Sequence, residues 1–355
     1  ILEAERKGAA DVFYFSAGDN FTGDPVIDRY EPPGQPMFEL LERLEVDLVC
    51  PGNHEFDYGL PTLRRFAARF PMVSANIEAP PGVLPGIRPW TVLKTGSGIR
   101  LVVFGLIQIE PGSTLPATHP EKVRELRFSQ PLTKVPELKR LRAKGEVMIG
   151  LTHLGHEQDR GLAGEMPEVD VIIGGHSHTR VDPAVMVNGV LVAQAGSDNQ
   201  FLGRIDLLVR NGRVADKSGR LIDLRQAPAA DEGVKAMIAA YHKNPAMLRV
   251  LVEAPLEISG KDALGSLMAD AIRGAHGLDI AFQNNGGIRL NRLPRAITLK
   301  DIYTLEPFGN EIVEIVMTPA EIRRLLTIAS EKRHGIDLQV SGLTCTIRAA
   351  AAATI

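Results

Sequence analysis

Short apolar runs alternate along this chain with stretches of helical periodicity, and no other feature limits its fold as strongly. Runs typical of β-strands occupy residues 12–16, 46–50, 72–75, 99–107, 147–151, 169–173, 190–193 and 204–209. A 3.6-residue period fits helices at residues 36–44, 60–70 and 133–144 between them. This alternation predicts an α/β layered fold built on central sheets.

The length of 355 residues is enough for two ordinary domains, each with a sizeable core. The segment LIDLRQAPAADEG at residues 221–233 is rich in Pro, Ala and charged residues, and it precedes a helix expected at residues 234–243. We therefore expect a first domain at residues 1–225 and a second domain at residues 226–355.

Composition argues against several classes of function. A formal net charge of -3 provides no basic field for a polynucleotide, although it does not exclude a free nucleotide. No stretch reaches the ~18 apolar residues of a transmembrane helix, and the opening residues ILEAERKGAA lack the layout of a signal peptide. Cys50 and Cys345 are too far apart for a metal knuckle or a CxxC pair. We expect one buried thiol in a strand and one in a late strand.

Four of the strand-like runs end in a glycine or small residue followed by side chains that can bind metals. The segments are FYFSAGDNFTG with Asp19 and Asn20, GNHEFDYG with Asn53, His54 and Asp57, VMIGLTHLGHEQD with His153 and His156, and VIIGGHSHT with His176 and His178. A single histidine after a strand is usually a surface residue, but five of the nine histidines fall in these segments. Loops at the carboxyl ends of strands are where α/β folds carry their sites.

The residue types indicate which ions such a site would hold. Imidazole, carboxylate and amide donors without thiolates suit Zn, Mn, Fe, Co or Ni, and do not suit Ca or a structural Cys-bound zinc. A carboxylate can bridge two cations about 3.5–4 Å apart, which together stabilise the attacking and leaving oxygens of an in-line displacement at phosphorus. The segments therefore predict a metal site suited to phosphoryl chemistry.

In their order, GDN, GNHE, the TH of GLTHLGHEQD and GGHSH resemble the signature blocks of the calcineurin-like metallophosphoesterases. AGDNFTG, GNHEFDYG, SANI and DVIIGGHSHT are more similar to the 5′-nucleotidase branch, which includes periplasmic UDP-sugar hydrolases. The resemblance implies a four-layer αββα sandwich followed by a smaller α/β substrate-specificity domain. It also implies two divalent metal ions, for which Zn, Mn, Co and Ni remain open.

The same resemblance implies a role for each residue of the motifs. Asp19 would bridge the two metals, Asn53, His153 and His176 would complete the shell of one, and His178 would serve the other. His54 and Asp57 resemble the His-Asp dyad of the family, in which the imidazole contacts the transferring phosphoryl group and the carboxylate orients it. The family's first strand ends in Asp-x-His, and no such segment precedes Asp11. The metal site is incomplete unless that segment lies upstream of this sequence.

Two segments of the second domain resemble the substrate-binding turns of 5′-nucleotidases. In isolation NNGG is a simple turn, and a Phe in EPFGN is more often a core residue. The resemblance implies that Asn284, Gly286, Gly287 and Arg289 contact the substrate phosphates, and that Phe308 stacks on the base. The match is incomplete, because residues 260–262 read GKD where the family usually carries an arginine, and residues 264–266 read LGS in place of LGN. The segment with the second clamp aromatic is absent from the sequence as it stands.

We therefore expect a 5′-nucleotidase that hydrolyses a nucleoside 5′-monophosphate to nucleoside and phosphate. Hydrolysis of a 2′,3′-cyclic nucleotide, a UDP-sugar or a sulfur ester on the same metal centre remains open. So does a non-catalytic nucleotide binder, should Asp-x-His be truly absent. A purely structural α/β protein is the least favoured alternative. The resemblance implies a periplasmic or cell-surface location, and the sequence leaves the oligomeric state open.

Overall fold

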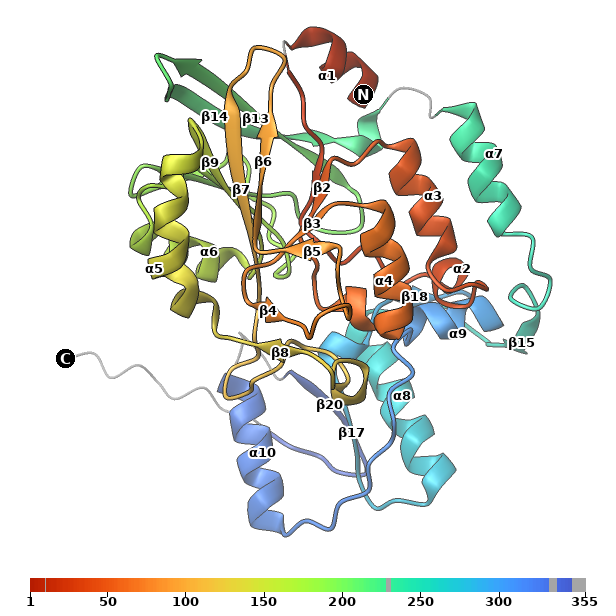
Figure 1. Cartoon of the computed structure of the whole chain (residues 1–355). Helices are drawn as coiled ribbons and strands as arrows, with labels where there is room; N and C mark the ends of the chain where they lie inside the picture. Colours follow the sequence, from red (N-terminus) through yellow and green to blue (C-terminus); the bar gives the residue numbers. More distant parts are fainter. Residues whose placement is uncertain (10, 228–230, 332–336, 347–355) are drawn as a thin grey trace. The chain divides into compact units, whose positions relative to one another are not determined.

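The computed structural model describes residues 1–9, 11–227, 231–331 and 337–346 (Figure 1). Contacts divide the chain into two compact units, with residues 1–22 and 29–241 in unit 1 and residues 23–28 and 242–355 in unit 2. The domain boundary expected between residues 225 and 226 stays a prediction, and residues 228–230 of the expected linker lie outside the described part of the chain.

Two central sheets organise unit 1. The four-stranded sheet has the order β1-β2-β3-β5, with β1 Phe15–Ser16, β2 Leu48–Val49, β3 Met72–Val73 and β5 Ile87–Arg88. The six-stranded sheet has the order β11-β12-β10-β9-β7-β6, with β6 Trp90–Lys94, β7 Arg100–Ile107, β9 Val147–His153, β10 Val171–Gly174, β11 Val185–Val187 and β12 Val190–Gln194. The first sheet is parallel throughout, and in the second only the edge strands β6 and β11 run antiparallel.

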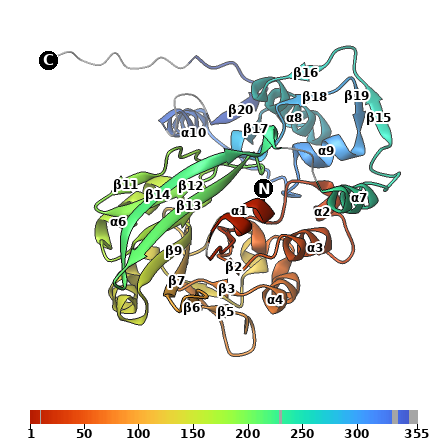
Figure 2. The ribbon, with the colours of Figure 1, turned by 90° about the horizontal axis from the view of Figure 1, so that it is seen from above.

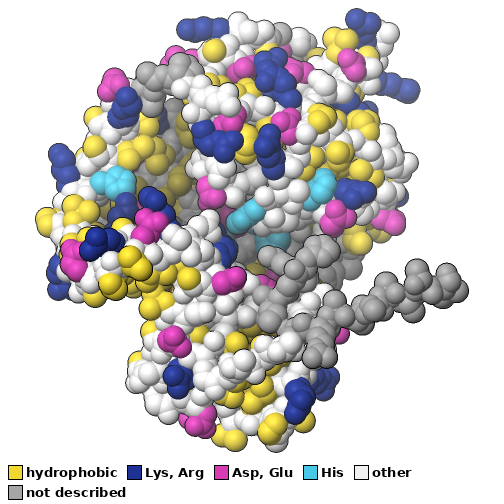
Figure 3. Space-filling view, turned by 180° about the vertical axis from the view of Figure 1, so that it is seen from behind, with side chains coloured by type: hydrophobic (Ala, Val, Ile, Leu, Met, Phe, Trp, Pro, Cys, Tyr) yellow, Lys and Arg dark blue, Asp and Glu magenta, His cyan; other side chains and the backbone are white. Residues whose placement is uncertain are grey.

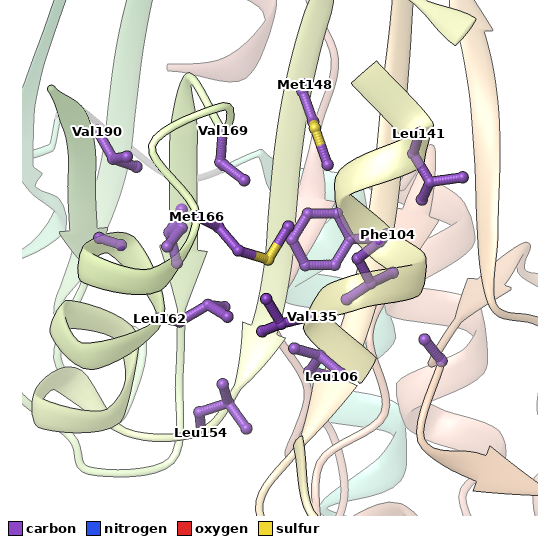
Figure 4. Close-up of a cluster of buried hydrophobic side chains, with 14 of the residues drawn as sticks. Phe104, Leu106, Val135, Leu141, Met148, Leu154, Leu162, Met166, Val169 and Val190 are labelled. Carbon is purple, nitrogen blue, oxygen red and sulfur yellow. The ribbon is translucent and has the colours of Figure 1, made fainter. Parts of the chain in front are cut away.

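Side chains alternate between two cores along β7, as the pleat of a strand requires. Leu101 and Val103 face the other sheet and pack with Leu48 and Val73. Val102, Phe104 and Leu106 face the opposite way, into a cluster with side chains of α5 Val135–Leu138 and α6 His156–Glu165 (Figure 4). A sheet buried on both faces explains why these strands read as continuous apolar runs.

Helices α3 Gln35–Arg43 and α4 Gly59–Arg69 cover the outer face of the four-stranded sheet (Figures 1 and 2). Their contact is aromatic, with the rings of Phe38 and Phe66 5.3 Å apart and Phe21 and Phe70 packed against Phe66 at 5.0 and 4.9 Å. Helices α3 and α4 form one outer layer, and α5 and α6 form the other. The two sheets lie between them, which gives four αββα layers. The fold class predicted from the sequence is confirmed.

The prediction of a single helix at residues 133–144 is wrong. The segment forms three short pieces, the 3₁₀ turn η3 Pro131–Lys134, the helix α5 and the 3₁₀ helix η4 Lys139–Lys144. Pro136 cannot donate a backbone hydrogen bond to the preceding turn, which sets a boundary near residue 135. The buried residues Val135, Leu138 and Leu141 are spaced by three, which is the period of a 3₁₀ helix.

The remaining elements of unit 1 lie around the two sheets. They are α1 Leu2–Gly8, the strand pair β4 Ile77–Glu78 and β8 Arg127–Phe128, the turns η1 His54–Phe56, η2 Pro120–Lys122 and η5 Leu224–Gln226, the hairpin β13 Phe201–Arg210 and β14 Arg213–Asp223, and α7 Glu232–Tyr241. Cys50 is buried, as expected, but it lies one residue after the end of β2 and not within the strand.

Unit 2 is built from strand pairs and helices around a small core of Leu264, Ile288, Leu293, Ile297 and Leu305. Its elements are α2 Pro25–Asp28, α8 Lys261–His276, α9 Leu299–Leu305, α10 Pro319–Glu331, the turn η6 Asn285–Gly287, and the pairs β15 Val250–Glu253 with β19 Ala296–Thr298, β16 Ile258–Ser259 with β18 Arg292–Leu293, and β17 Ala281–Asn284 with β20 Leu338–Ser341.

The prediction that Cys345 lies in a late strand is wrong. Strand β20 ends at Ser341, and Gly342 turns the chain with a positive φ of 85°, so that Cys345 lies outside any strand and is only partly buried. Among the described helices of both units, none combines the length and the apolar character needed to cross a membrane.

Candidate metal centre

Parallel strands bring the predicted ligands to one edge of each sheet in unit 1. Asp19 follows β1, Asn53 follows β2, His153 is the last residue of β9, and His176 follows β10. Because the carboxyl ends of parallel strands point the same way, side chains far apart in sequence gather there. Histidine side chains reach the surface on the face drawn in Figure 3.

Asp19, His153 and His176 form a cluster in which one ligand atom from each residue lies within 4.8 Å of the others. The His153 Nδ1 atom lies 2.6 Å from the carbonyl oxygen of Ala17, and only a protonated Nδ1 can donate to that oxygen. In the neutral imidazole of His153, Nε2 then carries the lone pair. It is buried and has no hydrogen-bond partner among the described residues, although Asp19 Oδ2 lies 3.0 Å away.

Asn53 joins this cluster through its side-chain oxygen. Its Oδ1 lies 3.1 Å from Nδ1 of His176, and its Nδ2 donates to the carbonyl oxygen of Ala117 at 3.2 Å. The second contact fixes the orientation of the amide, because only the nitrogen end can donate. The structure therefore places the Asn53 oxygen beside the three-residue cluster.

The backbone around the cluster is held in uncommon conformations. Asp19, His176 and His178 all have positive φ, at 59°, 74° and 56°. Residues other than glycine seldom adopt this region, and when they do they concentrate at functional sites. Gly52 has no space for a side chain, since a Cβ there would collide with Asp19 Oδ1 and lie 2.6 Å from Cε1 of His153. The motif glycine thus allows two ligands to approach each other.

The charges of the cluster interact strongly. Burial raises the pKa of Asp19, but the adjacent His153 outweighs that effect and holds it below its ordinary value. Burial lowers the pKa of His153, and the Asp19 carboxylate more than compensates, so that it is raised. Burial and the nearby His153 lower the pKa of His176 to about 4. At neutral pH the imidazole of His176 is therefore uncharged and can serve as a ligand.

His178 is placed differently from the other predicted ligands. Its side chain is exposed, and it is not among the three residues of the described cluster. Its charge contributes to lowering the pKa of His176, so the two imidazoles are near each other. The role of His178 at a second metal ion stays a prediction.

His54 and Asp57 lie together as the sequence motif predicted, with Nδ1 of His54 2.7 Å from Oδ2 of Asp57. Thr22 donates its hydroxyl hydrogen to the same carboxylate oxygen at 2.6 Å. Burial lowers the pKa of His54, but the hydrogen bond to Asp57 and the charges of the nearby carboxylates together outweigh it, so the pKa is raised. The backbone N–H of His54 donates to Oδ1 of Asp19 at 3.0 Å, which ties the pair to the metal cluster. The roles of both residues in catalysis stay predictions.

Several residues that the motifs did not single out position this site. The amide of Gln194 accepts from Ser177 Oγ and from the backbone N–H of Thr179, and it donates to the carbonyl oxygen of Gly175. These three contacts hold the loop that carries His176. Lys122 donates to the carbonyl oxygen of Asp57 at 2.5 Å. No local pattern marks Gln194 or Lys122, because each acts across a long sequence separation.

Unit 2 brings two predicted substrate-binding segments together. The guanidinium carbon of Arg289 lies 5.6 Å from the ring centroid of Phe308, and the backbone N–H of Arg289 donates to Leu305. Asn284 and Gly286 are exposed, whereas Gly287 is buried under the side chains of residues 283 and 284. The structure therefore places an exposed guanidinium beside a half-buried aromatic ring. Contact of these residues with a substrate stays a prediction.

The residues of the cluster fit a divalent cation. Nε2 of His153 and Oδ2 of Asp19 face each other at 3.0 Å, a spacing at which either a proton or a cation can lie between them. None of the ion pairs among the described residues gives Asp19 a Lys or Arg partner. The donor set of carboxylate, imidazole and amide is the one that first-row divalent ions accept.

These layers and this donor set define the class of metal-dependent phosphoesterases. The calcineurin-like phosphoesterase model matches residues 1–180, and the model of the 5′-nucleotidase C-terminal domain matches residues 248–354. The chain therefore belongs to the calcineurin-like phosphoesterases and carries the C-terminal domain of the 5′-nucleotidases. The resemblance read from the sequence motifs is confirmed, and the family's divalent-metal chemistry agrees with the cluster.

Known relatives match over nearly the whole chain. The crystal structure of a 5′-nucleotidase precursor from Thermus thermophilus is 29% identical, with a TM-score of 0.82 over 96% of this chain and 74% of that one. A 5′-nucleotidase from Vibrio cholerae is 27% identical over 97% of this chain and 72% of its own length. The endonuclease YhcR of Bacillus subtilis is also 27% identical over 97% of this chain, which spans 30% of the length of YhcR.

Proposed function

We propose that this protein hydrolyses nucleoside 5′-monophosphates to nucleoside and phosphate with two divalent metal ions. The observation that carries the proposal is the three-residue cluster of Asp19, His153 and His176, which lies beside the hydrogen-bonded pair of His54 and Asp57. The proposed metals are Zn, Mn, Co or Ni, with Asp19 as the bridge and His178 as a ligand of the second ion. The similarity to two 5′-nucleotidases supports the choice of substrate.

The residues of unit 1 divide the work between holding metal and stabilising charge. Bound divalent ions would polarise the phosphoryl oxygens and lower the pKa of the attacking water. Asp57 fixes the Nδ1 end of His54, so that Nε2 is the atom that can donate to a phosphoryl oxygen. The raised pKa of His54 favours the protonated form that such donation requires. Thr22 and Lys122 hold the Asp57 segment in place.

The residues of unit 2 would provide specificity for the nucleotide. Arg289 suits a bidentate contact with a phosphate, and the Phe308 ring beside it offers a face for a base. Asn284, Gly286 and Gly287 form the turn next to Arg289 and would contact the phosphate through amide groups. We further propose that the protein is located in the periplasm or at the cell surface. Cell fractionation after expression of the full-length protein measures this location directly.

A substrate panel tests this function. We expect the purified chain to hydrolyse nucleoside 5′-monophosphates, to lose this activity in a chelator and to regain it when Zn, Mn, Co or Ni is added. The panel also contains 2′,3′-cyclic nucleotides, UDP-glucose, a thiosulfate-type ester and a single-stranded polynucleotide. Faster turnover of any of these would move the assignment to that substrate. Nucleotide binding without turnover at saturating metal would favour a non-catalytic binder.

Replacing Phe308 with alanine is expected to raise KM for nucleotides while leaving KM for a small aryl phosphate almost unchanged. The reason is that base stacking on one aromatic ring contributes binding energy, and an aryl phosphate has no base to stack; an increase of about 5- to 100-fold corresponds to about 1–3 kcal/mol. Steady-state kinetics on both substrates measures the difference. The matched control is Phe13→Ala in unit 1. Equal effects of Phe308→Ala on both substrates would contradict stacking.

A further inference from the structure

Glu55 is the one acidic residue of GNHEFDYG to which the motifs assign no role, and it lies at the centre of the metal-site backbone. Its side chain is completely buried. Oε2 accepts from the backbone N–H groups of Asp19 at 2.8 Å and Gly52 at 2.5 Å. Oε1 accepts from the backbone N–H of Asn20 at 2.6 Å and from its side-chain amide at 3.0 Å. One carboxylate thus receives four N–H donors from two segments of the chain.

These contacts join the two loops that carry predicted ligands. Asp19 and Asn20 follow β1, whereas Gly52 and Glu55 follow β2, so the carboxylate connects residues 35 and 36 positions apart. Asp19 has a positive φ of 59°, a conformation that needs support from its surroundings. The Glu55 carboxylate supplies this support by fixing the N–H of Asp19 itself and of the residue after it.

Burial of Glu55 also has an electrostatic consequence. Among the ion pairs of the described residues none includes Glu55, so no Lys or Arg side chain neutralises its charge. The Glu55 carboxylate is instead held by four N–H groups and lies close to Asp19, a predicted metal ligand.

We propose that Glu55 is a positioning residue that sets the affinity of the metal site by holding the Asp19 loop against the Gly52 loop. Its carboxylate does not itself bind the metal, because each of its two oxygens already accepts two N–H hydrogen bonds. This inference rests on the proposed metal site. Partners that orient metal ligands typically affect metal affinity by about 10–100-fold.

The variant Glu55→Gln tests this proposal, because it keeps the length of the side chain and replaces one acceptor oxygen with an NH₂ group. That group faces N–H donors and cannot accept from them. We expect the dissociation constant for Mn or Zn, measured by titration of the metal-free chain, to rise by about 10–100-fold. Activity at saturating metal should recover toward that of the original chain. Near-UV circular dichroism verifies that the variant is folded.

The matched control is Asp170→Asn. Asp170 is also a carboxylate that accepts a backbone N–H, from Met148 at 2.8 Å, and it pairs with Arg142, but it precedes β10, whereas His176 follows that strand. The control should lower Tm and leave the metal dissociation constant within about twofold, because its site lies about 13 Å from the metal end of the strand. A purely structural role for Glu55 would make the two variants behave alike.

A second variant keeps the test decisive if Glu55→Gln does not fold. Glu55→Asp retains the charge but is one methylene shorter, so it cannot reach both loops, and we expect it too to weaken metal binding. A folded Glu55→Gln or Glu55→Asp chain with the original dissociation constant would overturn the proposal. If instead the unaltered chain and His153→Ala bind metal equally weakly, the proposed metal site itself fails, and the two failures are thereby distinguished.

Discussion

Replacing Asp19 with alanine is expected to abolish phosphoester hydrolysis and to reduce the metal bound per chain. Asp19 Oδ2 lies 3.0 Å from Nε2 of His153, and its Oδ1 accepts from the backbone N–H of His54, so the carboxylate connects the metal cluster to the neighbouring imidazole. Its loss removes the only carboxylate of the three-residue cluster among the described residues. Elemental analysis after dialysis measures the metal, and turnover of a nucleoside 5′-monophosphate measures the activity.

The control for this variant is Asp216→Ala, which removes an exposed aspartate of β14. It should retain metal and activity, because its carboxylate lies on a solvated strand. A change at Asp19 also removes the partner of His153 and an acceptor of the His54 N–H, so the metal-free variant is expected to be less stable than the unaltered metal-free chain. Full activity and full metal content in the Asp19 variant would refute the assignment of this cluster as a metal site.

Replacing His54 with alanine is expected to lower kcat by ~10² or more while the bound metal is retained, which is the usual loss when a preorganised stabilising donor is removed. His54 is not a member of the three-residue cluster, and its Nδ1 is held by Asp57 at 2.7 Å. It would therefore act on the substrate and leave the ions in place. Single-turnover kinetics at saturating nucleotide, together with elemental analysis, separates the two effects.

Two further variants define the dyad. Asp57→Asn keeps the shape of the partner but removes the negative charge that raises the pKa of His54, so we expect a smaller loss of kcat than in His54→Ala. His276→Ala, at the exposed end of α8, is the matched histidine control and should leave kcat unchanged. If His54→Ala turned over at the original rate, His54 and Asp57 would have no part in the mechanism.

The sequence predicted the layers of unit 1 well because they depend on local periodicity. Apolar runs of four to nine residues become the strands β7, β9, β10 and β12, and helices expected at residues 36–44 and 60–70 become α3 and α4 within one residue at each end. The expectation at residues 133–144 was wrong because three-residue spacing of apolar side chains was read as an α-helical period. Pro136 and that spacing favour short 3₁₀ pieces.

The polar positions of the site could be anticipated because each ligand ends a strand or lies within four residues after one. Asp19, Asn53, His153 and His176 are local features of their motifs, and a parallel sheet collects them at one edge. The sequence could not show that His178 is exposed or that Asn53 is oriented by the carbonyl oxygen of Ala117. Both depend on how a loop folds back over residues distant in sequence.

By itself the sequence determined which residue types meet at the strand ends, since strand periodicity and the glycines of the motifs are encoded over a few neighbouring positions. Only the tertiary structure decided how they are held. The Glu55 carboxylate gathers N–H groups from two loops, and Gln194 fixes the loop of His176, each across a separation that no local pattern records. The reason is that a buried polar group must find partners wherever the folded chain brings them, whatever their distance along the sequence.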